Sequence, residues 1–439
     1  MPGLLNLFRD FALKHNFADE AFIVGGTVRD LLLGRQINDA DITVRRDAID
    51  TGRSFADAAG GSFVLLDKDY GVTRVVKGSE HLDICAMRGN SISDDLAGRD
   101  LSINAMAVPL SSFANQKSMV GSEDLRQIVI DPYNGLQDLK YRIVRMVSEE
   151  NLVKDPLRLL RVYRFAAELN FTIEVHTSSA VRANATLISQ PAVERIADEL
   201  RHIFQSAASY QTITEMEKSG LLFHLFPELP EYPGEVWQQI RYSYGYAEHI
   251  LHNLNLYFPG RSASIQSYID AGTRTFCLKL AALFQDGKTV EKIADRLKLS
   301  RREAEFIAML TVDEDFPTLV DERSKPLIIR RMKTHGDDIY ALLIFSLATR
   351  RVCQLSGNPL ISSARDIVAL YEDEFIPRRS RLPLINGNDL TDKFSLSPSP
   401  LFREILSAID LLALEGRINT RAEALEEAGR MIRIKGANL

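Results

Sequence analysis

The stretch FIVGGTVRDLLLGRQINDADITV, residues 22–44, decides how the first part of the chain folds. An apolar run leads into a glycine pair, and Arg29 then opens a short apolar segment. Asp39 and Asp41 flank one alanine inside a strand-like run, so both carboxylates point to the same face, because side chains alternate along a strand. Two carboxylates on one face, after a glycine turn and an arginine, suit a divalent metal ion and a phosphorylated substrate.

The composition is that of a globular protein with more than one domain. The chain has 439 residues, of which 45% are hydrophobic and 26% charged, and this length predicts two to four domains. A net charge of −6 argues against a generally basic nucleic-acid binder but leaves room for a local basic cleft. Cys85, Cys277 and Cys353 lie far apart without metal-ligand spacing, which favours reduced thiols in a cytoplasmic protein.

The pattern of apolar residues changes near residue 146. Before it, short strand-like runs alternate with turns and two helical segments, which predicts an α/β or α+β unit of about 140 residues. After it, the helical period dominates and strand signals become rare. Residues 1–20 predict an amphipathic surface helix rather than a signal peptide, and the longest apolar run, 339–349, is too short to span a bilayer.

Two further stretches of the first unit carry polar residues whose role the sequence leaves open. Asp83, in a strand-like run, is a candidate third carboxylate or an ordinary solvated strand position. The stretch GRDLSINAMAV, residues 98–108, predicts a helix start with Asp100 or Ser102 as the cap. That interpretation leaves Arg99 and Asn104 without a role.

The stretch KDPLRLLRVYRFAAELNF, residues 154–171, predicts a helix that begins at Asp155 and Pro156. Three arginines recur every third residue and form a stripe along the helix, namely Arg158, Arg161 and Arg164. No carboxylate that could pair with them follows within this stripe. A solvated basic face is the usual interpretation of such a stripe. Unpaired guanidiniums beside an aspartate favour instead a polyanion or nucleobase site.

Two more stretches have unremarkable interpretations when each is taken alone. DPYNGLQDLKYRIVR, residues 131–145, contains turn signals and predicts a connector to the helical part. VERIADEL, residues 193–200, predicts an ordinary solvated helix face.

Five of these stretches, taken in chain order with their spacing, resemble the class II tRNA nucleotidyltransferase and bacterial poly(A) polymerase family; they are 22–44, 98–108, 131–145, 154–171 and 193–200. The family pattern has a GGxVRDxLLG turn with a DxD, an RRDxTxNA stretch, a DPxGGxxDL turn, an EDPLRxLRxxRFA helix and an ER-containing helix. The resemblance is dense over residues 22–200 and weak at LPLINGNDL, 382–390, and at LEGRINTRAEALEEA, 414–428. The chain departs from the pattern at Gly98, Asn134 and Lys154, and the tail's usual Pro-Gly-Pro-x-x-Gly is SPSPLFRE here.

The resemblance implies template-independent addition of nucleotides to an RNA 3′ end, either CCA or part of it on tRNA from CTP and ATP, or poly(A). Asp39 and Asp41 would hold Mg²⁺. Nucleotide contacts would come from seven residues of the motifs, namely Gly26, Arg29, Arg99, Asp155, Arg158, Arg161 and Arg164. Asp155 and Arg158 match the positions that read the base edge.

The resemblance also implies an α+β fold with a polymerase-beta-like palm as its head, followed by an elongated all-α neck, body and tail. The expected domains are a nucleotidyltransferase head (1–145), a nucleobase-selecting neck (146–205), a body (206–380) and an RNA-binding tail (381–439). The tRNA would lie along the helical part, and the oligomeric state stays open.

The body contains a segment that resembles a degenerate HD-type phosphohydrolase helix pair. Gln285 stands where a histidine would precede Asp286, so we expect a helical scaffold in which His249, His252 and Asp286 are structural. Two alternatives of other classes stay open: a non-catalytic RNA-binding protein, and a phosphohydrolase acting through this segment.

Overall fold

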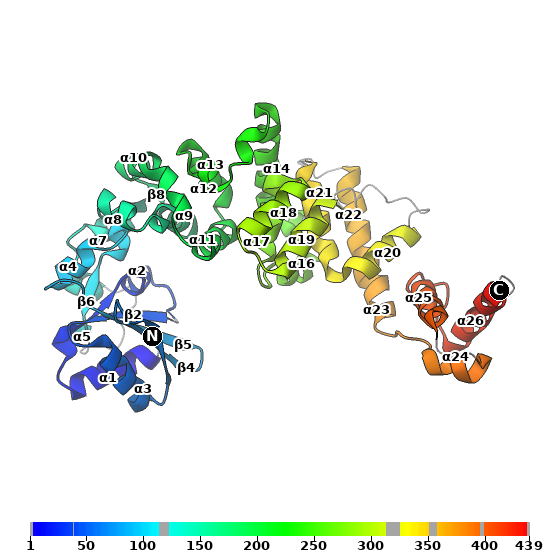
Figure 1. Ribbon diagram of the computed structural model, residues 1–439, viewed down its shortest axis with the longest axis horizontal. Coiled ribbons are helices and arrows are strands. Elements are labelled where there is room, and N and C mark those ends of the chain that lie inside the picture. Colours follow the sequence, from blue (N-terminus) through cyan, green and yellow to red (C-terminus); the bar gives the residue numbers. More distant parts are fainter. Residues whose placement is uncertain are drawn as a thin grey trace. The chain divides into compact units, whose positions relative to one another are not determined.

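A computed structural model describes residues 3–37, 39–113, 123–312, 325–350, 358–395 and 399–436 (Figure 1). The chain forms two compact units, Met1–Pro227 and Glu228–Leu439. The boundary between them lies within the proline-rich stretch 226–233. The finer division into head, neck, body and tail stays a prediction. No helix of the described part is long and apolar enough to cross a bilayer.

A mixed sheet forms the centre of the first unit. Its strand order is β3-β4-β5-β2-β1-β6, and the β2/β5 pair is parallel whereas the others are antiparallel. The strands are β1 Ala21–Val24, β2 Asp39–Val44, β3 Ser62–Asp67, β4 Val72–Lys77, β5 Glu80–Ala86 and β6 Ala107–Pro109. The register pairs Asp41 with Asp83, so two carboxylates lie side by side on neighbouring strands.

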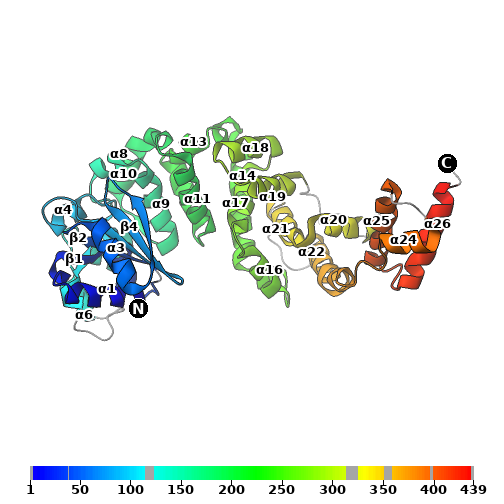
Figure 2. The same ribbon diagram turned by 60° about the horizontal axis from the view of Figure 1, so that its bottom comes forward.

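Helices cover the sheet where its strands present buried apolar residues, such as Ile42 and Val44 of β2. Helices α1 (Gly3–Lys14) and α3 (Ala48–Ala59) lie side by side (Figure 2). The rings of Phe8 and Phe55 join them, with centroids 5.0 Å apart. Phe22 and Val24 of β1 pack in a cluster with Leu96 of α4 (Ile92–Ala97). The remaining short elements are η1 Ala18–Glu20, α2 Gly26–Leu32, η2 Ser102–Asn104, α5 Leu110–Phe113, α6 Glu123–Ile128 and α7 Gly135–Tyr141.

The stretch 98–108 does not begin a helix, contrary to our prediction. It forms the 3-10 turn η2 and then strand β6. The run Ala-Met-Ala-Val at 105–108 is buried, and its last two residues belong to strand β6, which pairs with β1. Asp100 is buried and bonds to an arginine of another element, so it does not cap a helix.

The rest of the first unit is helical apart from a two-residue parallel pair, β7 (Ile143–Val144) with β8 (Thr172–Ile173). Its helices are α8 Glu149–Lys154, α9 Leu157–Leu169, α10 Val175–Asn184, η3 Ala185–Ser189, α11 Val193–Gln205, α12 Ser209–Lys218 and α13 Leu221–Leu225. Helix α9 packs against α11 and α12, with Leu159, Val162 and Tyr163 buried. Gly220, at a φ of 79°, separates α12 from α13.

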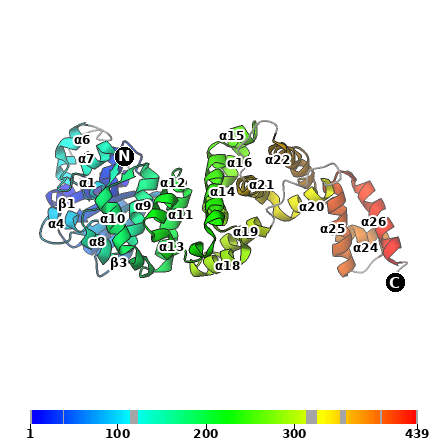
Figure 3. The same cartoon turned by 90° about the horizontal axis from the view of Figure 1, so that it is seen from above.

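The second unit consists of helices throughout its described part (Figure 3). Its first elements are η4 Leu229–Glu231, α14 Gly234–His252, α15 Leu254–Tyr257, α16 Ser262–Ile269, α17 Arg274–Phe284, α18 Gly287–Arg296 and α19 Arg301–Val312. They are followed by α20 Lys325–His335, η7 Gly336–Asp338, α21 Ile339–Thr349, α22 Pro359–Ala369, the π-helix η8 Leu370–Phe375, α23 Ile376–Arg379, α24 Gly387–Phe394, α25 Pro400–Leu414 and α26 Arg421–Gly436.

Helix α21 is the core of the second unit. Its residues from Ile339 to Ala348 are all buried, and it packs against α14 and α17. The apolar run 339–349 is therefore a central helix of a globular unit. A separate apolar cluster joins α24, α25 and α26 through Leu390, Ile405 and Ala424. Cys353 lies outside the described residues.

Candidate active site

Strand β2 presents Asp39 and Asp41 on one face, as the spacing predicts. The Asp39 carboxylate is 72% exposed and lies 2.8 Å from Nδ1 of His81. Asp41 is less exposed, and its backbone N–H donates to Oγ1 of Thr27 at 2.7 Å. This bond holds the strand against α2, which follows the glycine pair.

The surroundings of Asp41 favour a bound cation. Burial raises the pKa of Asp41, and the charges of Asp83 and Asp39 raise it further, although Arg99 and Arg29 oppose them. A divalent ion at this position would offset the repulsion between neighbouring carboxylates. Among the described residues, no three or more His, Cys, Asp or Glu side chains gather into a group that could hold a metal ion. Two carboxylates with waters and substrate phosphates are a usual donor set for Mg²⁺, so the pair fits that ion.

Asp83 is engaged by an arginine in this structure. Arg74 donates Nε to Oδ1 and Nη2 to Oδ2 of Asp83 at 2.7 and 2.8 Å. Such a bidentate pair uses both carboxylate oxygens. Asp83 therefore acts on the site as a nearby charge that influences Asp41.

The glycine turn fits closely against Arg99. Gly25 has φ 66° and ψ −134°, a backbone conformation that favours glycine. A Cβ atom built on Gly25 would lie 2.6 Å from Nη1 of Arg99. Arg99 is itself fixed, because Nε and Nη2 donate to Oδ2 of Asp95 and Nη1 donates to the carbonyl of Asn104. The Cβ position on Gly26 is 3.5 Å from Nη2 of Arg29, so both predicted arginines line the turn.

Arg29 is buried, and much of its hydrogen-bonding capacity is used within the protein. Nε and Nη2 donate to Asp30 at 2.9 and 2.8 Å, and Nη1 donates to Oδ1 of Asn104 at 2.8 Å. Its guanidinium carbon lies 4.9 Å from the centre of the Phe165 ring. Arg29 thus contributes positive charge behind the turn, with 9% of its side chain exposed.

The start of α9 brings together the residues predicted to read a base. Asp155 accepts a hydrogen bond from Nη2 of Arg195 at 3.3 Å, and Nε of Arg158 lies 3.9 Å from the same Asp155 oxygen. That distance is too long for a hydrogen bond, so the donors of Arg158 are available for a ligand. Burial lowers the pKa of Arg158. A carboxylate acceptor beside a guanidinium donor can match the edge of a nucleobase.

Our prediction of unpaired arginines along α9 is wrong for Arg161 and Arg164. Nε of Arg161 donates to Oδ2 of Asp100 at 2.7 Å, and Nε of Arg164 lies 3.0 Å from Oε2 of Glu199. The prediction that 193–200 forms a solvated face is also wrong at Glu199, which is buried. The carboxylate partners come from elements distant in sequence, so inspection of the stripe alone missed them.

The HD-like segment of the second unit shows a structural role for Asp286. This carboxylate accepts from the N–H of Thr289 and caps helix α18, while Gln285 ends α17 at a φ of 50°. The His249 ring packs at 79° against the Tyr257 ring, and His252 is exposed at the end of α14. These are contacts of the fold, and the scaffold role of the segment stays a prediction.

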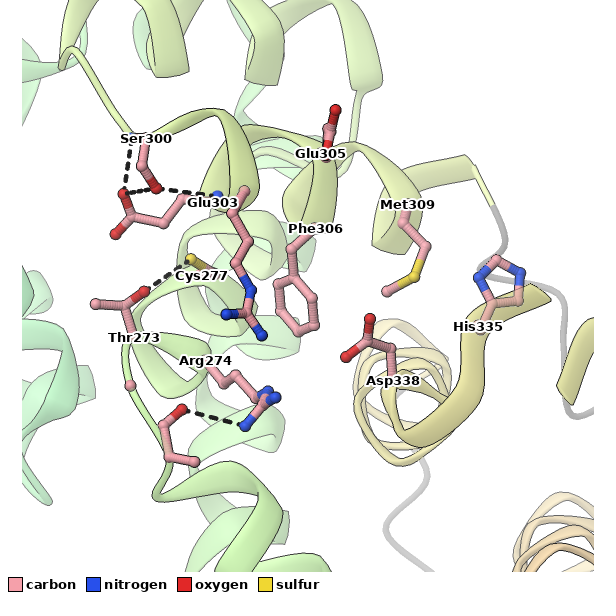
Figure 4. A pocket seen from close by; sticks show the side chains of 13 residues that line it. Thr273, Arg274, Cys277, Ser300, Glu303, Glu305, Phe306, Met309, His335 and Asp338 are labelled. Atoms are coloured by element: carbon pink, nitrogen blue, oxygen red, sulfur yellow. Dashed lines mark hydrogen bonds between the residues drawn. The ribbon is translucent and has the colours of Figure 1, made fainter. Parts of the chain in front are cut away.

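A pocket of about 680 Å³ lies beside this scaffold, between α17, α19 and the end of α20 (Figure 4). Its polar groups largely serve the fold. Arg274 donates to the carbonyl of Tyr268, Ser300 bonds to Glu303 at the start of α19, and Asp338 accepts from the Tyr268 hydroxyl. The wall between them is apolar, with Phe306 and Met309.

Three residues of the first unit with central contacts were missed as site residues. Asn104 bonds to Arg29, Phe165 lies near the guanidiniums of three arginines, and Glu199 faces two arginines of α9. The one available signal was that Asn104 had no role in a helix start.

Comparison with known proteins places this site in a family. The family described as Poly A polymerase head domain matches residues 21–145, and the one described as Probable RNA and SrmB- binding site of polymerase A matches 170–232. A CC-adding tRNA nucleotidyltransferase of Synechocystis sp. is 31% identical, over 93% of each chain. An A-adding tRNA nucleotidyltransferase of Deinococcus radiodurans is 28% identical, over 93% of this chain and 94% of its own.

A solved structure with the same fold is the Thermotoga maritima CCA-adding enzyme complexed with tRNA. It has a TM-score of 0.68 and 24% identity, over 98% of this chain and 96% of its own. The match of the head to the polymerase head family and the tRNA nucleotidyltransferases among its relatives define the class of nucleotidyltransferases. Within that class, the chain belongs to the family of tRNA nucleotidyltransferases and poly(A) polymerases.

Proposed function

We propose that this protein adds nucleotides, without a template, from CTP, ATP or both to the 3′ end of tRNA and releases pyrophosphate. The observation that carries the proposal is the position of Asp39 and Asp41 next to the turn at Gly25, in the same compact unit as Asp155 and Arg158. The relatives named above add CC or A to tRNA, which supports tRNA as the substrate.

Asp39 and Asp41 are the proposed ligands of Mg²⁺, which when bound would lower the pKa of the RNA 3′-hydroxyl and neutralise the triphosphate. Arg29 and Arg99 lie against the glycine turn and would offset phosphate charge there. The exposed Asp39 side chain is placed for an incoming ligand, whereas Asp41 sits deeper beside Asp83.

The base of the incoming nucleotide is proposed to meet the start of α9. Asp155 would accept a hydrogen bond from an exocyclic amino group, and Arg158 would donate to ring acceptors. Arg161 and Arg164 were predicted to touch the nucleotide as well. Since both pair with buried carboxylates, their proposed contribution is to hold α9 and to place positive charge behind the site.

The division into a head (1–145), a base-selecting neck (146–205), a body (206–380) and an RNA-binding tail (381–439) is part of this proposal, as is a cytoplasmic location. Addition of AMP alone as a poly(A) polymerase is the alternative within the family. An RNA-binding protein without catalysis is the alternative outside it.

Incubation with tRNA transcripts that end before the CCA, after one C or after two C, with CTP, ATP or both, tests the proposal. Sequencing the 3′ ends distinguishes CCA, CC and A addition from long A tracts. Asp39→Ala and Asp41→Ala should each abolish incorporation while RNA binding persists. Asp57→Ala, an exposed carboxylate on α3, is the matched control and should act like the wild type. Turnover retained in either site variant would refute the metal-ligand assignment, and no incorporation by the wild type on any RNA 3′ end would favour the binding protein.

A further inference from the structure

A ring of contacts within the first unit joins the glycine turn to helix α9, and Asn104 is its central member. Nη1 of Arg29 donates to Oδ1 of Asn104 at 2.8 Å, and Nδ2 of Asn104 donates to Oδ1 of Asp100 at 3.2 Å. Oδ2 of Asp100 then accepts from Nε of Arg161 at 2.7 Å. The ring closes at Phe165, whose centre lies 5.2 Å from the Arg161 guanidinium and 4.9 Å from that of Arg29.

Most of the ring is buried, although 31% of the Arg161 side chain is exposed. Asn104 and Asp100 are each 5% exposed, Arg29 is 8% exposed and Phe165 is 5% exposed. Hydrogen bonds in such surroundings are stronger than in water, and a broken one leaves a buried polar group without a partner. A change at Asn104 is therefore transmitted to both neighbours.

Asn104 also holds the second arginine of the turn. Its backbone carbonyl accepts from Nη1 of Arg99 at 3.5 Å, while its side chain accepts from Arg29. One residue thus contacts both arginines that line the turn and reaches α9 through Asp100. Arg158, which we propose reads the base, lies one turn before Arg161 on the same helix.

The two bonds of the side chain require an amide at position 104. The group must accept from a guanidinium and donate to a carboxylate at the same time, and a primary amide has both functions. An aspartate would keep the bond from Arg29 but place a second carboxylate against Asp100. A leucine of similar size would remove both bonds.

We propose that Asn104 is a positioning residue for nucleotide selection, which fixes the base-reading start of α9 relative to the arginines of the glycine turn. This inference rests on the proposed function, since it assigns base reading to Asp155 and Arg158. The proposed role is indirect and acts through Arg29, Arg99 and Asp100, which Asn104 contacts.

The test compares Asn104→Asp with the exchanged double variant Asp100→Asn/Asn104→Asp. The exchange keeps the net charge and restores an amide facing a carboxylate, with their places reversed. The matched control is Tyr163→Phe, also on α9, which removes a buried hydrogen bond to Oγ of Ser219 on the side facing α12.

Two readouts separate positioning from general loss of stability. The first is the ratio of kcat/KM for CTP and ATP. It should shift about tenfold in Asn104→Asp, as expected for loss of one charge-assisted hydrogen bond, and return to within about threefold of wild type in the exchanged variant. In Tyr163→Phe it should stay within about twofold. The second is hydrogen exchange of the α9 amides without nucleotide, which should become about tenfold faster in Asn104→Asp.

Each outcome decides the inference. An unchanged CTP/ATP ratio in Asn104→Asp overturns the inference, even if hydrogen exchange in α9 is faster. In that case Asn104 stabilises α9 without influencing nucleotide selection. A ratio that the exchanged variant does not restore also overturns it. If the wild type transfers no nucleotide, the proposed function fails by itself, and hydrogen exchange alone decides whether Asn104 fixes α9.

Discussion

Substitution of Gly25 by alanine should inactivate the protein through Arg99. The new methyl group would lie 2.6 Å from Nη1 of Arg99, whereas ordinary contacts of this kind begin at 3.4 Å. Arg99 has little freedom to withdraw, because two of its nitrogens bond to Asp95 and the third to the carbonyl of Asn104. Either these bonds break or the turn moves away from Arg99.

Two effects set the size of the change. Alanine at φ 66° and ψ −134° costs about 1–3 kcal/mol of folding stability. Relief of the contact requires a displacement of about 1 Å, and an error of that size in a catalytic arrangement costs about 100-fold in rate. We therefore expect a modestly destabilised protein whose nucleotide incorporation falls about 100-fold.

Gly60→Ala is the matched control. Gly60 ends α3 at a φ of 65°, and a Cβ atom there meets open space. This variant should lose about 1 kcal/mol of stability, measured by urea unfolding, and keep its rate of incorporation. If Gly25→Ala loses no more activity than Gly60→Ala, the contact with Arg99 has no functional weight and the reasoning is refuted.

Four further predictions concern other residues. Asp41→Asn should abolish incorporation yet raise the thermal midpoint of the metal-free protein, because burial raises the pKa of Asp41 and the charged form opposes folding above its ordinary pKa. Mg²⁺ at ten times its Kd should raise the wild-type midpoint by about 3–6 °C and leave the midpoint of this variant unchanged. An equal shift in both proteins would contradict metal binding by Asp41. Asp100→Asn should lower the free energy of unfolding at pH 7, measured by urea unfolding, by about 2 kcal/mol. Burial opposes the charged form of Asp100, but Arg161 overcomes this and lowers the pKa from 3.8 to about 2. The stabilisation is therefore present above pH 4 and disappears as the pH falls toward 2. An equal acid dependence of stability in the variant and the wild type would contradict this prediction. Arg158→Ala should lower the discrimination between CTP and ATP by about tenfold or more while RNA affinity in gel-shift titrations changes less; an unchanged preference would count against base reading. Asp286→Ala should cost about 1 kcal/mol in thermal unfolding through loss of the α18 cap and leave incorporation intact, whereas a collapse of incorporation without unfolding would assign chemistry to the HD-like segment.

Local pattern was sufficient to predict the strand that carries the carboxylates. The run around Asp39 and Asp41 was expected as a strand, and β2 spans Asp39–Val44, because alternation and β-branched residues act within one short segment. The turn after β1 was also predictable, since the glycine pair marks backbone that other residues rarely adopt. These predictions depend on residues close together in sequence.

Ion pairs between residues that lie far apart in sequence could not be predicted from such local patterns. The arginine stripe of α9 looked unpaired because Asp100 and Glu199 lie 61 and 35 residues away from their partners Arg161 and Arg164. Asn134 could be predicted in a turn but not its φ of 59°, the left-handed conformation that asparagine adopts more readily than most residues. Pairing of charges across a fold becomes visible only when the elements that carry them are placed together.

The partial burial of the Asp100 and Arg161 pair has a consequence for how the protein responds to ionic strength. Counterions screen exposed charges within about 10 Å at 0.1 M salt, but they screen a partly buried pair such as Asp100 and Arg161 much less. Attraction between exposed arginines and RNA phosphates, in contrast, weakens steeply as salt displaces protein from the polyanion. Raising the salt concentration should therefore reduce how often RNA is engaged while the choice among nucleotides, once it is engaged, stays nearly constant.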